Sequence, residues 1–169
     1  ADPKLESFKN VLPTRFANWQ IRWLGENKLA LIKPPTLENT QVSLFTLDTN
    51  EKTLRSLLDF KNNLEMAWST DGQKLLYSYI DPTIGQNGLY FMNLATKEEA
   101  PLNLAYAASK CTWSLDNKTA YCAGKDSFVS FDATAATVET QTVANSQSAN
   151  AASAANLFIT GTEDYLIFK

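Results

Sequence analysis

Apolar and polar residues alternate along the chain in short runs that are separated by turn residues, a pattern typical of β-strands. An apolar run ends in an aromatic residue at four positions that are each 45 residues apart: Trp23, Trp68, Trp113 and Phe158. Turn-forming residues follow each aromatic, such as Asp71-Gly72 and Asp116-Asn117, and a second apolar run comes next. The fixed spacing predicts a repeated unit that begins with a β-hairpin.

Two further strands are predicted in each of the first three units. The third strand alternates apolar and polar residues and ends in Asp or Asn, at residues 44–48, 89–93 and 128–132. A more polar fourth strand follows a polar turn, at residues 53–58, 100–104 and 137–143. Four short antiparallel strands in a unit of about 40–45 residues are typical of a β-propeller blade. A β-sandwich is the alternative, but its strands have no reason to repeat at a fixed spacing.

The sequence therefore predicts an all-β fold of β-propeller type with about three and a half four-stranded antiparallel blades. The predicted segments are an N-terminal segment with a candidate closing outer strand (1–13), blade 1 (14–63), blade 2 (64–108), blade 3 (109–145), a flexible linker (146–155) and a partial blade 4 (156–169). A short alanine-rich helix is the alternative for the linker. Propellers close with about four to eight blades, so the chain is either a minimal ring or part of a larger one. An open arc would expose apolar flanks, and we expect it to dimerise or to dock on a partner.

The segment from Trp68 to Tyr77 resembles the W-S-P-D-G-K turn of TolB-like propeller repeats. Residues 113–121 and 23–31 look like diverged copies, and Thr70 stands where these repeats usually have proline. The resemblance covers about residues 18–169 and implies blade architecture. It also implies a role in binding proteins or in shielding a neighbouring catalytic domain. Residues 110–114 and 120–123 are similar to bacterial extracytoplasmic propellers that carry a cysteine on each of these two strands.

Cys111 and Cys122 flank the third hairpin. If Asp116 and Asn117 form the turn, the two cysteines face each other across the strands and could form a disulfide. The alternative is a pair of buried thiols that pack as small apolar side chains. A disulfide would indicate an oxidising compartment, so we expect an extracytoplasmic protein, in the periplasm or at the cell surface.

Composition removes several classes of function. The 169 residues include no histidine, which excludes Ser-His-Asp and Cys-His catalysis and His-ligated metal sites. The 15 basic and 18 acidic residues are scattered, which argues against nucleic acid as a partner. No apolar run approaches the roughly 20 residues of a membrane-spanning helix. Turn aspartates, at positions 48, 71, 116 and 132, are expected to accept backbone hydrogen bonds. We therefore expect no catalytic residue, metal or cofactor, and not an enzyme.

Loops between the second and third strands are the candidate binding surface, because long loops on a rigid scaffold carry recognition. The residues singled out there are Pro34, Pro35, Asp81, Pro82 and Gly85. Trp19 breaks the 45-residue spacing and is expected to be exposed for ligand contact, whereas the spaced aromatics are expected to form the core between blades. The predicted function is a non-enzymatic module that binds a protein or peptide, its own copy, or the rest of a larger propeller. The alternative is the accessory propeller of a peptidase or other hydrolase whose catalytic domain lies elsewhere.

Overall fold

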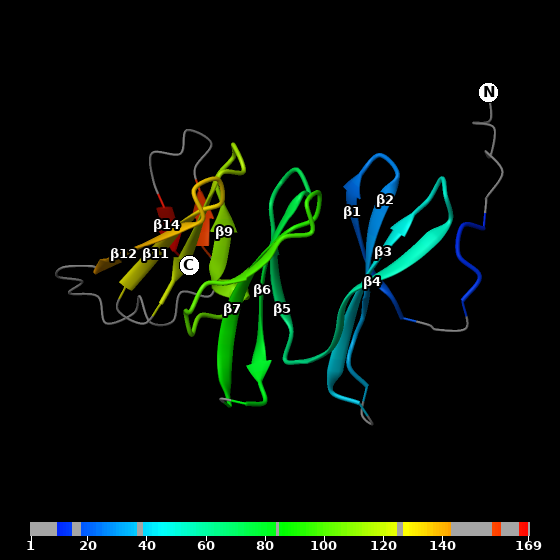
Figure 1. The fold of residues 1–169 in the computed structure, drawn as a ribbon, viewed down its shortest axis with the longest axis horizontal. Helices are drawn as coiled ribbons and strands as arrows, with labels where there is room; N and C mark the ends of the chain where they lie inside the picture. Colours follow the sequence, from blue (N-terminus) through cyan, green and yellow to red (C-terminus); the bar gives the residue numbers. More distant parts are fainter. Residues whose placement is uncertain are drawn as a thin grey trace. The chain divides into compact units, whose positions relative to one another are not determined.

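The computed structural model describes residues 10–14, 18–36, 39–83, 85–124, 127–142, 157–159 and 166–168. Its strands are β1 (Gln20–Gly25), β2 (Lys28–Lys33), β3 (Gln41–Asp48), β4 (Thr53–Asn62), β5 (Glu65–Trp68), β6 (Lys74–Asp81), β7 (Gln86–Asn93), β8 (Glu99–Pro101), β9 (Cys111–Trp113), β10 (Thr119–Ala123), β11 (Ser127–Asp132), β12 (Thr137–Thr142), β13 (Leu157–Ile159) and β14 (Leu166–Phe168). One 3₁₀ turn, η1 (Ala108–Lys110), precedes β9 (Figure 1).

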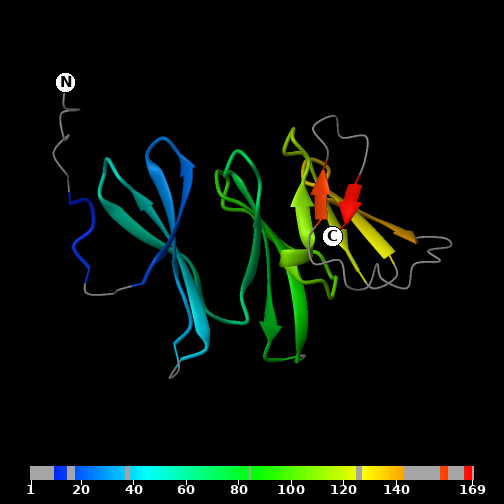
Figure 2. The same cartoon turned by 180° about the vertical axis from the view of Figure 1, so that it is seen from behind.

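The strands form three four-stranded antiparallel sheets, each with its strands in chain order, and β13 pairs with β14 (Figures 1 and 2). We call β1–β4 blade 1, β5–β8 blade 2 and β9–β12 blade 3. The prediction of an all-β fold with about three four-stranded blades is confirmed, and a β-sandwich is not what forms. The chain divides into two compact units, residues 1–60 and 61–169, which are described separately.

A self-contained turn closes the inner hairpin of blade 2. The Ser69 hydroxyl donates to Asp71 Oδ1 at 2.6 Å and accepts the Lys74 amide at 2.9 Å. The Gln73 amide donates to Asp71 Oδ1 at 3.0 Å, and Gly72 takes the positive φ of 67° that the turn requires. Burial raises the pKa of Asp71, but the Ser69 hydroxyl and the Gln73 amide outweigh it and hold that pKa below its ordinary value. The predicted structural role of Asp71 is confirmed.

Blade 3 repeats this turn with the same bonds. The Ser114 hydroxyl donates to Asp116 Oδ1 at 2.6 Å and accepts the Thr119 amide at 3.0 Å, while the Lys118 amide donates to Asp116 at 2.9 Å. The Ser114 hydroxyl and the Lys118 amide lower the pKa of Asp116. Asn117 occupies the position of the blade 2 glycine, with φ 59°. The predicted Asp-Asn turn is therefore the observed one.

The same hydrogen-bonded turn follows the third strand of each blade. The side-chain oxygens of Asp48, Asn93 and Asp132 each accept the backbone amides two and three residues further on, at 2.7–3.3 Å. The amides of Ala135 and Thr134 lower the pKa of Asp132. These side chains hold the turn into the fourth strand, as an Asx-turn does. The prediction that the strand-end aspartates accept backbone hydrogen bonds is confirmed.

The strand β8 is shorter than predicted, because it ends at Pro101 rather than at residue 104. Proline has no amide hydrogen and so cannot donate to the ladder. The chain nevertheless stays beside β7, since the Leu102 amide donates to the Leu89 carbonyl and the Leu89 amide to the Leu104 carbonyl, both at 2.9 Å.

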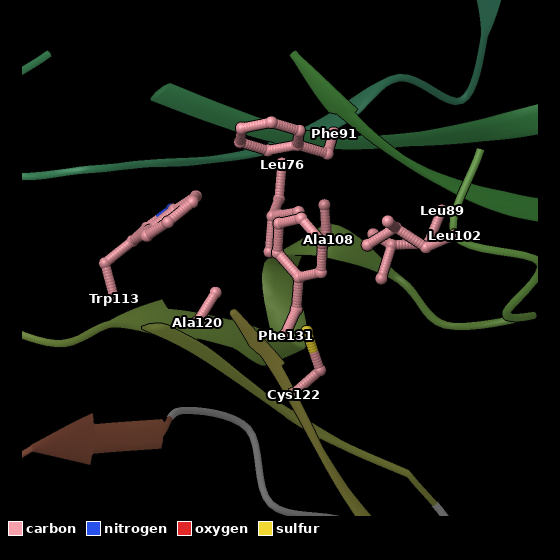
Figure 3. Close-up of a cluster of buried hydrophobic side chains, with 9 residues drawn as sticks. All are labelled: Leu76, Leu89, Phe91, Leu102, Ala108, Trp113, Ala120, Cys122 and Phe131. Atoms are coloured by element: carbon pink, nitrogen blue, oxygen red, sulfur yellow. The ribbon is translucent and has the colours of Figure 1, made fainter. Parts of the chain in front are cut away.

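Blades 2 and 3 share one apolar core. We call the face of each blade that carries its spaced tryptophan the Trp face, and the opposite face the back face. Trp113 and Phe131 lie on the Trp face of blade 3, because β10 pairs with both β9 and β11 through Ala120. They pack on the back face of blade 2, where Phe91 lies 4.9 Å from the Phe131 ring and 6.3 Å from the Trp113 ring (Figure 3). The remaining buried members of the cluster are Leu76, Leu89, Leu102, Ala108 and Cys122.

The Trp face of blade 1 carries a smaller cluster made of Leu29, Leu31 and Leu47. Three side chains that precede β1 in the chain pack on it together with Phe45: Val11, Leu12 and Trp19. The segment at residues 10–14 contains no strand and contributes apolar contacts to a sheet face. The rest of the predicted N-terminal segment, residues 1–9, lies outside the described residues.

The spaced aromatics do not share one environment. Trp113 is buried, Trp68 is half-buried and Trp23 is 65% exposed, so the prediction of a buried Trp23 is wrong. The N-terminal residues cover the cluster on β2 and β3 but leave Trp23 exposed, and within the described residues no sheet precedes blade 1. The strand that contains Phe158 pairs with β14, but its side chain and the predicted linker at 146–155 lie outside the described residues.

Candidate functional site

The candidate loops lie at one end of their sheets, opposite the inner hairpins. In blade 2, the β5–β6 turn and the β6–β7 loop stand at opposite ends of the sheet (Figure 1). The same strand order places the β2–β3 loop opposite the β1–β2 turn in blade 1. The β2–β3 loop at residues 34–40 is longer than the β1–β2 turn at 26–27, but the β6–β7 loop at 82–85 is shorter than the β5–β6 turn at 69–73, so the predicted contrast in length is wrong for blade 2. Each loop is therefore presented by a regular sheet.

The β2–β3 loop closes on itself through short-range bonds. The Thr36 amide donates to the Asn39 carbonyl at 2.7 Å, and the Asn39 amide donates to the Thr36 hydroxyl at 3.1 Å. The Gln41 amide then donates to Asn39 Oδ1 at 2.9 Å, where β3 begins. Pro34 is half-buried and Pro35 is exposed, so the second proline presents a rigid apolar ring to solvent.

The β6–β7 loop is organised by Asp81. Its side chain accepts the Thr83 amide at 2.7 Å, and its carbonyl accepts the Gly85 amide at 2.8 Å. Gly85 has a φ of 65° and open space where a side chain would stand, while Pro82 is exposed. Ile80, at the end of β6, also exposes part of its side chain. This loop offers an ordered, mixed apolar and polar surface with room beside it.

A shorter third loop joins β10 and β11, where the Gly124 amide donates to the Ser127 carbonyl at 2.8 Å. Tyr106 covers it, with its hydroxyl 2.7 Å from the Ser127 hydroxyl. A Cβ at position 124 would lie 2.6 Å from the Tyr106 ring, so a larger residue there would require that ring to move. The sequence pattern does not single out Tyr106, because it lies outside any predicted strand.

Trp19 is not an exposed contact residue. It is half-buried, packs against the Leu29 cluster of blade 1 and meets the Phe45 ring edge-on at 5.7 Å. Packing of an indole against a sheet face does not require a strand, so the spacing rule could not predict it. The exposed indole of blade 1 is Trp23.

A tyrosine stack on blade 2 is the main aromatic feature that the sequence pattern missed. Tyr77 and Tyr90 pair across β6 and β7, and Tyr79 stacks beside them, with ring centroids 5.0–6.2 Å apart. The Lys61 ammonium lies 4.1 Å from the Tyr79 ring centroid. A Cβ at Gly88 would lie 2.9 Å from the Tyr90 ring, so a larger residue there would require the Tyr90 ring to shift.

Hydrogen bonding and burial raise the pKa of two of these phenols, Tyr90 and Tyr77. The hydrogen bond with Tyr79, together with burial, raises the pKa of Tyr90 to about 12. Burial raises the pKa of Tyr77 further, and the Glu99 carboxylate, which accepts the Tyr77 hydroxyl, adds to the effect. A phenol with a raised pKa is a weak acid near neutral pH, so the stack is suited to packing and hydrogen bonding rather than to proton transfer.

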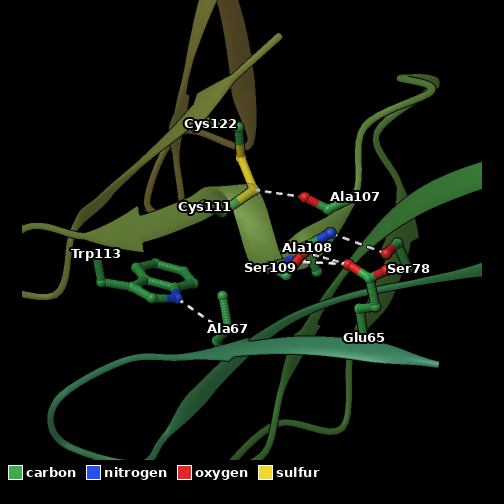
Figure 4. Close-up of a disulfide and its surroundings, with 9 residues drawn as sticks. All are labelled: Glu65, Ala67, Ser78, Ala107, Ala108, Ser109, Cys111, Trp113 and Cys122. Atoms are coloured by element: carbon green, nitrogen blue, oxygen red, sulfur yellow. Dashed lines mark hydrogen bonds between the residues drawn. A yellow bond between two sulfur atoms is a disulfide. The ribbon is translucent and has the colours of Figure 1, made fainter. Parts of the chain in front are cut away.

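The structure joins Cys111 and Cys122 in a disulfide between β9 and β10, in the predicted register (Figure 4). It accounts for both cysteines of the chain. The Cys111 sulfur lies 3.8 Å from the Ala107 carbonyl oxygen, beside η1. The disulfide therefore fixes the innermost strand of blade 3 at the point where the chain enters that blade.

Hydrogen bonds attach this same region to blade 2 (Figure 4). The Ala108 amide donates to the Ser78 hydroxyl at 2.8 Å, and the Ser109 hydroxyl donates to the Glu65 carboxylate. The Trp113 indole N–H donates to the Ala67 carbonyl at 3.0 Å. The Trp113 bond places the indole of blade 3 on β5, the inner strand of blade 2.

Asn117 forms a further link between the two hairpin turns. Its Oδ1 accepts the Thr70 amide at 2.7 Å, and its carbonyl accepts the Lys74 ammonium at 2.8 Å. Replacing Asn117 with glycine allows the same positive φ but removes the hydrogen bond that the Thr70 amide donates to the Asn117 side chain. We therefore expect Asn117→Gly to lower the free energy of unfolding by about 1 kcal/mol in urea denaturation.

Asn103→Gly is the matched control, because Asn103 has a similar φ of 55° and an exposed side chain. It should change the free energy of unfolding by no more than about 0.5 kcal/mol. Equal effects of the two substitutions would contradict the assigned role of the Asn117 side chain.

No set of three or more metal-ligating side chains comes together in the part of the chain that the structure describes. The same residues include no helix with the length and apolarity needed to cross a membrane. The candidate binding elements are thus two ordered loops, one on blade 1 and one on blade 2, and blade 2 also carries the tyrosine stack.

Comparisons agree with this architecture. No protein-family model and no curated protein matches the chain. The β-propeller domain of the Trilobed protease from Pyrococcus furiosus is similar over 80% of this chain and 46% of its own, with TM-score 0.57 and 14% identity. An acylaminoacyl peptidase from Pyrococcus horikoshii is similar over 76% of this chain and 25% of its own, with TM-score 0.50 and 15% identity.

A TolB from Agrobacterium tumefaciens also matches, over 70% of this chain and 43% of its own, with TM-score 0.48 and 17% identity. The chain spans less than half the length of each of these three proteins. At this level of identity the likeness concerns the fold. The fold is a β-propeller fold with a partial set of blades, which confirms the architecture that the repeat resemblance implied.

Proposed function

We propose that this chain is a non-enzymatic propeller module that binds a protein or peptide through its inter-strand loops, with the β2–β3 and β6–β7 loops as the candidates. The supporting observation is the internal order of these two loops. Each loop is held by its own Asx and backbone hydrogen bonds, and each exposes a proline ring. Ordered loops bind with less loss of conformational entropy than mobile ones.

The chemistry of the loops fits an extended peptide. Pro35 and Pro82 present exposed rigid rings, and open space lies next to Gly85. The absence of histidine from the whole sequence supports a binding role over catalysis. The disulfide supports an extracytoplasmic location, in the periplasm or at the cell surface.

Loop replacement tests the proposal. Peptides selected from a phage-displayed random 12-residue library on the wild-type chain are the probes. Replacing residues 34–40 and 82–85 with short Gly-Ser turns should abolish their binding in fluorescence anisotropy, because the recognition surface is removed while the sheets remain. Far-UV circular dichroism should show an unchanged strand signal.

Leu115→Ser is the control, because it changes an exposed residue in the turn at the opposite end of blade 3. It should leave peptide affinity unchanged. Peptides that bind the loop-replaced chain as tightly as the wild type would overturn the assignment.

A second candidate function is the accessory propeller of a peptidase or other hydrolase. It is favoured by the similarity to a protease propeller domain and to an acylaminoacyl peptidase, of which this chain spans 46% and 25%. A Gly-x-Ser-x-Gly motif followed by a histidine in the same polypeptide would support this candidate. Further blades behind a membrane anchor would support the binding module.

A further inference from the structure

Phe60, in β4 of blade 1, combines an exposed aromatic ring with a backbone conformation that bulky residues rarely adopt. Its side chain is 62% exposed, and its φ is 51°, in the left-handed region. This conformation is strained for a residue with a large side chain, whereas glycine and asparagine adopt it readily. An exposed ring also gains little from the core of its own blade. Neither the backbone nor the packing of blade 1 therefore explains a phenylalanine at this position.

The other non-glycine residues with positive φ have a local explanation. Lys52, Lys97 and Ala136 occupy the same position of the turn that follows the third strand in each blade. The rest of the described residues of this kind, apart from Phe60, are asparagines: Asn18, Asn63, Asn103 and Asn117. Asn103 follows the fourth strand of blade 2, so asparagine serves near the end of an outer strand in that blade. Phe60 fits neither group.

Hydrogen bonding and strand pairing place Phe60 at the loop end of blade 1. Its amide donates to the Ser43 hydroxyl at 3.3 Å, and the Ser43 side chain is buried. Ser43 pairs in turn with Lys33, which directly precedes Pro34 and Pro35. The end of β4 thus lies at the same end of the sheet as the β2–β3 loop. These residues all belong to the first compact unit, residues 1–60.

We propose that Phe60 is a contact residue of the recognition surface at the β2–β3 loop, where its ring packs against a large apolar side chain of the bound peptide. This inference rests on the proposed function and adds to it a residue outside both loops. The exposed rings of Phe60 and Pro35 supply apolar surface at one end of one blade. A strained residue that the fold does not require is typical of a binding site. The matching group is apolar, because a polar group buried under the ring would lose its hydrogen bonds to water.

Fluorescence anisotropy with the phage-selected peptides tests the proposal. Phe60→Asn should weaken their binding by about tenfold or more, because it removes the ring and keeps a residue that accepts the backbone conformation. Phe60→Tyr retains the ring and should bind within about threefold of the wild type. Leu54→Asn is the matched control, because Leu54 is 41% exposed at the other end of β4, and it should leave affinity unchanged.

Urea denaturation of Phe60→Asn separates a binding role from a structural one. The midpoint should stay at the wild-type value or rise, because asparagine adopts the left-handed backbone with less strain than phenylalanine. A lowered midpoint would show that the ring supports the fold, and it would overturn the proposal.

Alanine scanning of the selected peptides identifies the group that meets the ring. Replacing one large apolar peptide residue should weaken binding to the wild-type chain by about tenfold and binding to Phe60→Asn by much less, because the two groups are coupled only if they touch. Equal losses on the two chains at every peptide position would overturn the proposal.

The loop-replaced chain distinguishes the two proposals. If it does not bind the peptides while Phe60→Asn binds them as tightly as the wild type, the loops form the site and the role of Phe60 is overturned. If the loop-replaced chain still binds, or if the library yields no peptide, the proposed function fails and this inference fails with it.

Discussion

Phe131→Ala is expected to lower the free energy of unfolding of the second unit by about 3–5 kcal/mol. The Phe131 ring is 1% exposed and lies 4.9 Å from the Phe91 ring, in the core that joins blades 2 and 3. Removing it deletes apolar contacts on both sides of that junction and leaves a cavity that the two sheets cannot fill. Urea denaturation followed by tryptophan fluorescence measures the loss, because Trp113 lies in the same cluster.

The matched control is Leu115→Ala, which truncates an exposed apolar side chain of the same blade. It should change the free energy of unfolding by no more than about 0.5 kcal/mol. A Phe131→Ala protein with wild-type stability would show that the blades do not depend on this shared core.

Reduction of the disulfide is expected to lower the free energy of unfolding by about 2–3 kcal/mol, because the link between Cys111 and Cys122 closes a loop across 11 residues of sequence. The experiment compares urea denaturation of the wild-type chain with and without dithiothreitol. The double substitution Cys111→Ala and Cys122→Ala should match the reduced protein and should not respond to the reductant. A wild-type midpoint that dithiothreitol leaves unchanged would contradict the stabilising role of the disulfide.

The strand order and register within each blade could be predicted from the sequence because they depend on local signals. The Asp-Asn turn at residues 116–117 fixes which residues face each other, and this alone places Cys122 opposite Cys111. The same holds for the strand-end aspartates, whose partners are amides two and three residues away. Short-range chemistry of this kind is independent of what the blade packs against.

Burial of the aromatic residues could not be predicted in the same way. Trp23 and Trp113 occupy equivalent positions in the repeat, yet only Trp113 has a neighbouring blade against it among the described contacts. Trp19 is half-buried through a contact with Phe45 that crosses more than 20 residues of sequence. Such contacts depend on tertiary packing, which a 45-residue period does not encode.

The sequence pattern predicts the positions of the candidate loops, but it does not predict the hydrogen bonds within them. Pro and Gly marked the loop positions, whereas the bonds of Asp81 to Thr83 and Gly85 became visible only in three dimensions. The tyrosine stack was missed because its alternating tyrosines indicate only a strand. Which rings meet depends on the pairing of Tyr77 with Tyr90 across β6 and β7.

The bonds of the Ser-Asp turns have a consequence for the order of folding events. All of the bonds between Ser69 and Lys74 span at most five residues, and those between Ser114 and Thr119 span no more. Contacts between residues so close in sequence form early, since little chain entropy is lost, and hairpins form within about 1–10 μs. We expect each inner hairpin to form before its blade packs against a neighbouring blade. The packing of preformed blades would then limit the folding rate.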